Sequence, residues 1–184
     1  MCAFLLVLCG TAPVLGSRIV LVASRRRQQA AEPLILRPTV LAASHNLTGY
    51  APDRAVDGNP STYWLVPGGQ RMEKMSRDKW LVLDLGRPAV PSALTIRGVV
   101  STLGGARICL DRGESPSGPW RRVTTLRGLR GLRTPVQCDL PASLPPTRYF
   151  RLYIRREGHA TFRHVIHDLS FTCRRPEADA GLVG

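Results

Sequence analysis

The most informative segment of the sequence is AASHNLTGYAPDRAVDGNPSTYW, residues 42–64. It is dense in turn chemistry, because Asp57–Pro60 joins two dipeptides that favour turns, and Ser61 and Thr62 can bond the nearby backbone. The aromatic pair Tyr63–Trp64 follows at once and gives the turn an apolar surface to pack against. The turn also gathers several side-chain oxygens, which a hard cation such as calcium requires. A solvated turn closed by its own hydrogen bonds is the simpler interpretation.

Outside this stretch the chain is typical of an all-β domain. From Leu34 onward, short segments of alternating apolar and polar residues are broken by Gly, Pro, Asp and Ser, as in a sandwich or barrel. The clearest segments are Trp80–Leu85 and Tyr149–Arg155. Side chains of a strand alternate between its two faces, so we expect one apolar set from each segment to face the core: Leu81, Leu83 and Leu85 from the first, and Phe150, Leu152 and Ile154 from the second.

An ordered set of short motifs adds to this pattern. The set comprises Ala55–Trp64, Trp80–Gly86, Leu94–Val99, Ser117–Trp120, Arg148–Leu152 and Asp168–Phe171. Together they resemble the discoidin family, the coagulation factor V/VIII type C domain, over roughly residues 38–173. The resemblance implies a galactose-binding-like β-sandwich, or jelly-roll barrel, used mostly as an extracellular module that binds glycans, lipid head groups or proteins.

The net charge bears on the class of partner, and the two chain ends bear on the cellular location. The formal net charge is +13 at pH 7, and Lys74 and Lys79 are the only lysines. Such a charge favours acidic partners, but the chain has no helix-turn-helix, zinc-finger or stacking-platform signature, which disfavours nucleic acid. We divide the chain into a signal peptide (1–16), a basic linker (17–33), the discoidin-like domain (34–173) and a disordered tail (174–184). No Lys or Arg precedes the apolar leader, so an uncleaved leader and a cytoplasmic setting stay open.

The cysteines form no metal-binding pattern. Cys2 and Cys9 lie in the leader, and Cys109 and Cys138 could form a disulfide. Cys173 matches the closing cysteine of the family, whose usual N-terminal partner is absent here. The alternative is that all of them are reduced, small and buried.

No arrangement of residues predicts catalysis. His164 and His167 are three apart, so on a strand they point to opposite faces and do not converge. The carboxylates are scattered, and no nucleophile elbow or phosphate-binding loop occurs. We therefore expect a protein that is not an enzyme.

The resemblance implies one structural calcium site. Its ligands would be Asp57, Asn59 and Thr62 of the turn, together with Asp168 beside the C-terminal strand. Many metal-binding members have Glu at that last position, so Asp168 is one methylene shorter and would ligate weakly or through water.

The resemblance also places ligands at the loops of one end of the sandwich: Ser44–Tyr50, Leu65–Lys79 and Ser101–Ala106. The second loop carries Met72 and Met75 among Arg71, Lys74 and Arg77, and with Leu103 these could engage an anionic membrane. A glycan would instead use the donors and aromatic faces of His45, Tyr50, Arg71 and Arg107. Asn46–Thr48 is a glycosylation sequon that would place a sugar on Asn46.

The sequence therefore predicts a non-catalytic, secreted binding or adhesion module. Its partner would be a glycan or an anionic membrane surface, met by the loops at one end of the sandwich. The alternative is an intracellular protein–protein interaction module of the same fold.

Overall fold

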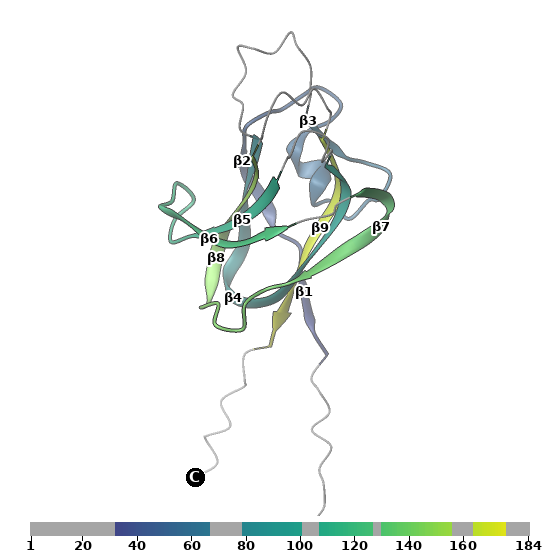
Figure 1. The fold of residues 1–184 in the computed structure, drawn as a ribbon. Coiled ribbons are helices and arrows are strands. Elements are labelled where there is room, and N and C mark those ends of the chain that lie inside the picture. The colour runs from purple at the N-terminus through teal and green to yellow at the C-terminus, as the bar shows by residue number, and fades with distance from the viewer. Residues whose placement is uncertain (1–31, 67–78, 101–106, 127–129, 156–163, 176–184) are drawn as a thin grey trace, which may run out of the picture. The chain divides into compact units, whose positions relative to one another are not determined.

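The computed structural model describes residues 32–66, 79–100, 107–126, 130–155 and 164–175. The chain divides into two compact units, residues 1–30 and 31–184, and all described residues belong to the second. They form strands and one short 3-10 helix (Figure 1). In chain order these are β1 Leu34–Leu36, β2 Thr39–Ala43, η1 Pro52–Ala55, β3 Trp64–Val66, β4 Lys79–Val100, β5 Arg107–Gly113, β6 Trp120–Leu126, β7 Arg130–Asp139, β8 Thr147–Arg155 and β9 His164–Arg174.

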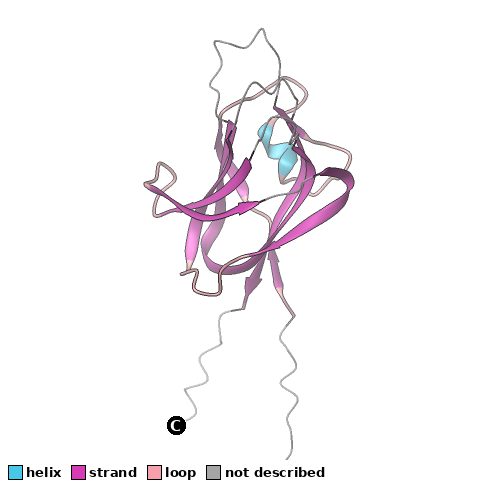
Figure 2. Cartoon of the chain, in the orientation of Figure 1, coloured by secondary structure: helices cyan, strands magenta, loops and turns pink. Residues whose placement is uncertain are grey.

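The strands pair antiparallel in two sheets that share β4 (Figure 2). The first sheet has the order β2-β4-β8-β5-β6. In the second sheet β1 and β3 lie against β9, which pairs with β4, and β4 pairs with β7. The early part of β4, Lys79–Asp84, belongs to the first sheet and the later part, Val90–Val100, to the second. A strand that changes sheets in this way makes a corner of a sandwich, so the predicted all-β sandwich is confirmed.

The core lies between the two sheets, and the predicted alternation supplies it. Leu81 and Leu83 are fully buried, and so is Phe150 of β8. The Phe150 ring lies 4.9 Å from the ring of Phe171 in the second sheet, centroid to centroid. Each such side chain contributes about 2 kcal/mol when it leaves water. The inward sets predicted for both segments are thus confirmed, since all of their members belong to the core.

The predicted disulfide between Cys109 and Cys138 is wrong in this structure, because both thiols are free, as is that of Cys173. The cause is the side of the sheet on which each residue lies. Ile108 and Leu110 belong to the core, so Cys109 between them points outward from the first sheet. Cys138 lies in the second sheet and packs against the core. The first sheet therefore separates the two sulfur atoms.

The start of β9 lies very close to β4 at Gly98. A Cβ atom there would lie 2.3 Å from the carbonyl oxygen of Val165, so only glycine fits. The register between the strands shifts at the same point, between Arg97 and Gly98. This close approach fixes the backbone at the start of β9, where His164 lies.

Candidate functional site

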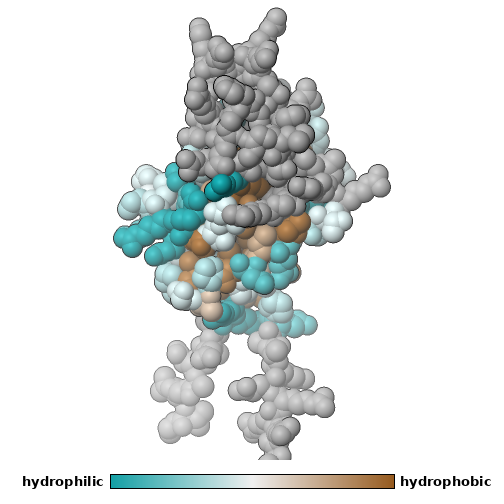
Figure 3. All heavy atoms as spheres, viewed as in Figure 1, coloured by the Kyte–Doolittle hydropathy of each residue, from teal (hydrophilic) through white to brown (hydrophobic). Residues whose placement is uncertain are grey.

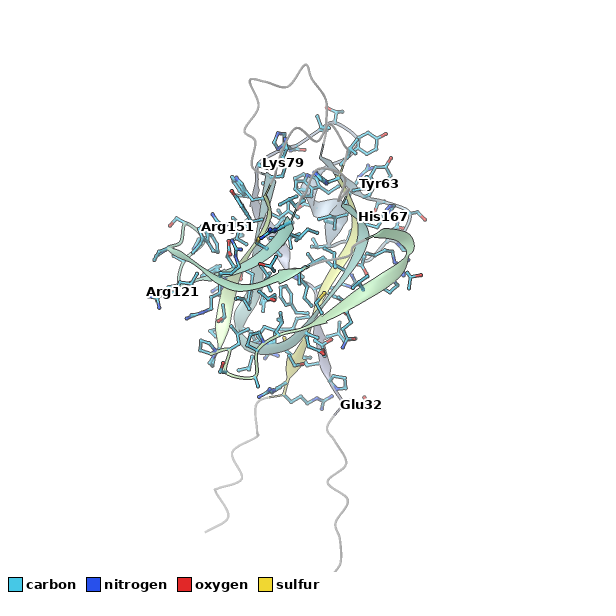
Figure 4. All side chains as sticks on the ribbon, in the orientation of Figure 1. Glu32, Tyr63, Lys79, Arg121, Arg151 and His167 are labelled. Atoms are coloured by element: carbon cyan, nitrogen blue, oxygen red, sulfur yellow. The ribbon has the colours of Figure 1, made fainter. Side chains whose placement is uncertain are left out.

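Three connections between strands begin and end at one end of the sandwich. Strand residues that flank segments 67–78, 101–106 and 156–163 are paired with one another, which places them at the same end of the sheets. We call this the loop end; its strand residues are Val66, Lys79, Val100, Arg107, Arg155 and His164. Figure 4 shows Lys79 toward the end of the sandwich opposite Glu32. Six predicted ligand-binding residues lie outside the described residues: Arg71, Met72, Lys74, Met75, Arg77 and Leu103.

A buried histidine organises the loop end. His45 directly follows Ser44 after β2, and its side chain is only 4% exposed. Its Nε2 atom lies 3.1 Å from Nζ of Lys79, and its Nδ1 atom lies 2.9 Å from Oγ of Ser44. The buried indole of Trp64 donates from Nε1 to the His45 carbonyl oxygen at 3.0 Å. Trp80 donates its backbone N–H to the Ser44 hydroxyl oxygen at 2.9 Å. Residues that are far apart in the sequence thus form one connected group.

The hydrogen bonds of His45 determine where its proton sits. The ammonium of Lys79 has only donors, so Nε2 of His45 must accept. The proton is therefore on Nδ1, which donates to Ser44. Burial, and to a lesser extent the charge of Lys79, lowers the pKa of His45, which favours this neutral ring. Because Nδ1 is already protonated, His45 cannot take a proton from Ser44 as the base of a nucleophilic pair would.

A second histidine near Lys79 is also kept neutral. Burial, together with the charge of Lys79, lowers the pKa of His164 to about 4. Its Nδ1 atom is buried, and among the described residues it has no hydrogen-bond partner. Among the described residues, the loop end therefore combines the ammonium of Lys79 with two neutral imidazoles, which gives it positive potential.

An aromatic row lies at the same end of the sandwich as this cluster. The rings of Tyr50 and Tyr63 are stacked with centroids 5.0 Å apart, and Tyr63 lies 5.1 Å from the ring of His167. Nδ1 of His167 is 3.1 Å from the carbonyl oxygen of Pro60 in the turn. His167 thus contacts the turn while His164 responds to Lys79, in agreement with the prediction that the two histidines do not converge. Figure 4 shows Tyr63 and His167 side by side at the same end as Lys79.

The turn predicted to hold calcium is closed by its own hydrogen bonds. The carboxylate of Asp57 accepts from the backbone N–H of Asn59 at 2.8 Å and from the hydroxyl of Thr62 at 2.6 Å. The Asn59 side chain accepts from the N–H of Ser61 at 2.9 Å. The fourth expected ligand, Asp168, lies outside the turn and forms an ion pair with Arg37. In this arrangement the oxygens of the four groups face internal donors and a cationic side chain, and calcium binding stays a prediction.

The remaining predicted residues are more peripheral. Arg107 is exposed at the start of β5 and pairs across the sheet with Arg155. Asn46 is exposed next to His45, and its glycosylation stays a prediction. The sequence placed Lys79 among the basic residues of the Leu65–Lys79 loop but did not connect it with His45, and it did not assign His164 to the site.

Within the described ranges, no group of three His, Cys, Asp or Glu side chains is placed to hold a metal ion. Over the same residues, the structure contains no helix of the length and apolar character needed to cross a membrane.

Comparisons with known proteins show the fold. No protein-family model matches the sequence, and no curated protein matches it. Among solved structures, a chitosan-binding module of a chitosanase/glucanase from Paenibacillus sp. IK-5 superposes with a TM-score of 0.55 at 16% identity, over 74% of this chain and 95% of that one. The CBM32 module of AlyQ, solved with 4,5-unsaturated mannuronic acid, gives a TM-score of 0.51 at 17% identity, over 73% of this chain and 96% of that one. An F5/8 type C domain from Bacteroides fragilis gives a TM-score of 0.55 at 13% identity, over 76% of this chain and 99% of that one.

The class of fold follows from these comparisons. The chain has the discoidin-like, galactose-binding-like β-sandwich fold that CBM32 and F5/8 type C domains share. The fold predicted from the ordered motifs is therefore confirmed.

Proposed function

We propose that this protein is a non-catalytic, extracellular module that binds an acidic glycan at the loop end. The observation that carries the proposal is the cluster of Lys79 with the neutral rings of His45 and His164. An ammonium next to neutral imidazoles carries a charge that attracts a carboxylate or sulfate group of a sugar.

Two further features support an acidic glycan. The net charge of +13 steers anionic ligands toward the protein over distances longer than a contact. The row of Tyr50, Tyr63 and His167 offers aromatic surface at the same end as the cluster, of the kind that lines binding sites for small polar ligands. Charge and aromatic surface at one end of the sandwich are together suited to a sugar with an acidic substituent.

The structural neighbours support a glycan as the class of ligand. One is described as a chitosan-binding module and another was solved with an unsaturated mannuronic acid. They share the fold with this chain at low sequence identity, so they support where a ligand binds better than which ligand it is.

The test is a binding assay on the full chain with three immobilised probes. These are oligomannuronate, chitosan oligosaccharide and vesicles containing phosphatidylserine. We expect oligomannuronate to bind and chitosan, which carries positive charge, to bind weakly. Binding to vesicles alone would replace the glycan with a membrane surface, and binding to none of the probes would contradict the proposal.

A matched pair of variants tests the location. Lys79→Met removes the charge of the cluster, whereas Arg121→Met removes one charge from exposed strand β6 (Figure 4). We expect the first variant to bind oligomannuronate about tenfold more weakly and the second to bind within about twofold of wild type. Equal losses in the two variants would mean that net charge alone, and not the loop end, determines binding.

One observation favours a second candidate, an intracellular protein–protein module. The three described cysteines are free, and free thiols are typical of a reducing compartment. Intact mass and a thiol count on protein purified from its native source separate the two candidates. A cleaved leader supports the extracellular module, and an intact leader with reduced cysteines supports the intracellular one.

A further inference from the structure

Arg37 lies at the point where three separate segments meet. It follows β1 and precedes β2, and its Nη1 atom forms an ion pair with Oδ1 of Asp168 in β9. The pair is partly exposed, with 45% of the arginine side chain and 22% of the aspartate side chain accessible. The two residues are 131 positions apart in sequence, so this contact ties the beginning of the domain to its last strand.

The same guanidinium also packs against the turn. Gly58 has a φ of +76°, and a Cβ atom on it would lie 3.1 Å from Cζ and 3.2 Å from Nε of Arg37. The guanidinium therefore rests on the bare backbone of the turn, where a side chain at position 58 would press against it. Arg37 thus contacts both halves of the predicted calcium site, the Asp57–Thr62 turn and Asp168.

We propose that the guanidinium of Arg37 takes the place of a calcium ion as the cation that joins the turn to β9. A calcium ion takes about six to eight oxygen ligands, and a carboxylate such as Asp168 would supply one or both of its oxygens. Here a planar cation with several N–H donors faces that carboxylate, and the turn supplies its own hydrogen-bond donors. A metal ion placed between them would meet the positive charge of Arg37 at close range.

The consequence is a turn that closes without any metal ion. Each carboxylate oxygen of Asp57 accepts a hydrogen bond from within the turn, one from Asn59 and one from Thr62, so the chain itself sets the orientation of this carboxylate. The turn carries Pro60, whose carbonyl contacts His167, and so the aromatic row is also positioned without metal.

The first experiment compares the full wild-type chain in calcium chloride and in chelator. We expect the melting temperature to be the same in both, and a calorimetric titration with calcium chloride to give no heat of binding. A rise of the melting temperature in calcium, or a saturable heat, would overturn the proposal.

The second experiment tests the arginine itself. Arg37→Met should lower the melting temperature by about 2 °C or more, because it removes the ion pair and the packing on Gly58 together. Arg121→Met, which removes an exposed arginine from β6, is the control and should change it by less than about 1 °C.

A double variant shows whether the arginine acts through Asp168. If Arg37 and Asp168 form one unit, Arg37→Met combined with Asp168→Asn should be no less stable than the less stable single variant. Fully additive losses, or an Arg37→Met protein as stable as Arg121→Met, would overturn the proposal.

Discussion

Charged side chains are arranged differently on the outer face of the first sheet and at the loop end. On the sheet, Asp111 is 2% exposed and accepts from Arg151 at 2.8 Å, and it is also ion-paired with Arg122. Nearby, Asp84 accepts two hydrogen bonds from Arg148, at 2.8 and 2.9 Å. At the loop end, Nζ of Lys79 lies 3.1 Å from Nε2 of the neutral His45 ring. Carboxylates hold the arginines of the sheet in place. At the loop end, by contrast, the charge of Lys79 lowers the pKa of His45 and His164.

Stacking reinforces the difference. The guanidinium of Arg151 lies 5.0 Å from the ring of Trp120 and 5.1 Å from that of Tyr153. An arginine fixed by a carboxylate and by aromatic faces contributes to stability and cannot easily turn toward a ligand. Figure 3 shows that hydrophilic side chains gather over β6 on this side of the molecule. An excess of arginine is therefore not by itself a binding surface, since these arginines are used within the fold.

The largest effect is expected from breaking the buried pair on the sheet. Asp111→Asn leaves Arg151 and Arg122 without their carboxylate in a buried position, and we expect it to lower the free energy of unfolding by about 3 kcal/mol. Urea unfolding measures the loss. The control is Asp139→Asn in exposed β7, expected within about 0.5 kcal/mol of wild type. If both variants were equally stable, the ion pairs of the sheet would have no structural role.

An intermediate effect is expected from acid at the loop end. The pKa of His164 is about 4 in the folded protein against 6.5 in the unfolded chain, so the unfolded chain takes up the proton first. Its contribution to stability is complete above pH 6.5 and declines as the pH falls toward 4, by about 1.4 kcal/mol per pH unit. At pH 5 we expect the protein to have lost about 2 kcal/mol relative to pH 7.5. The pKa of His45 is lowered as well, which adds a loss of the same sign.

Variants assign this acid sensitivity to a residue. His164→Leu removes the titrating ring and should flatten the dependence of unfolding free energy on pH between 7.5 and 5. His167→Leu removes an imidazole from the same strand and is measured in parallel as the matched variant. Asp84 does not affect this pH window, because its hydrogen bonds with Arg148 lower its pKa from the usual 3.8 and its contribution to stability is lost only in stronger acid. A steep profile in His164→Leu would contradict the assignment.

The sequence predicted what depends on local pattern and missed what depends on register. Alternation placed Leu81 and Phe150 in the core, and the turn dipeptides located the Asp57–Thr62 turn. The contact of His45 with Lys79 joins residues 34 positions apart, and it arises from the pairing of β2 with β4. No spacing in the sequence encodes such a pairing.

The wrong disulfide has a related cause. Counting cysteines gives candidates for a bond, but the bond also requires both sulfur atoms on the same side of a sheet. Cys109 occupies an outward-facing position between two core residues. This orientation depends on the place of β5 in the sheet, between β6 and β8. The ion pair of Arg37 with Asp168 was missed for the same reason, because it depends on the pairing of β1 with β9.

The smallest change in stability is expected from Lys79→Met. This variant also tests most directly whether the charges of the sheet and of the loop end have different roles. Removing the ammonium should raise the pKa of both His45 and His164, since the charge of Lys79 lowers each of them. The stability at pH 7.5 should change by less than about 1 kcal/mol, while the loss on acidification becomes smaller. Histidine ring signals followed by NMR during a pH titration report the pKa values directly. If stability is nearly unchanged while oligomannuronate binding falls, the charge of the loop end serves the ligand and not the fold. If instead Lys79→Met destabilises the protein as strongly as Asp111→Asn, the two regions are alike, and the distinction between structural and binding charges does not hold.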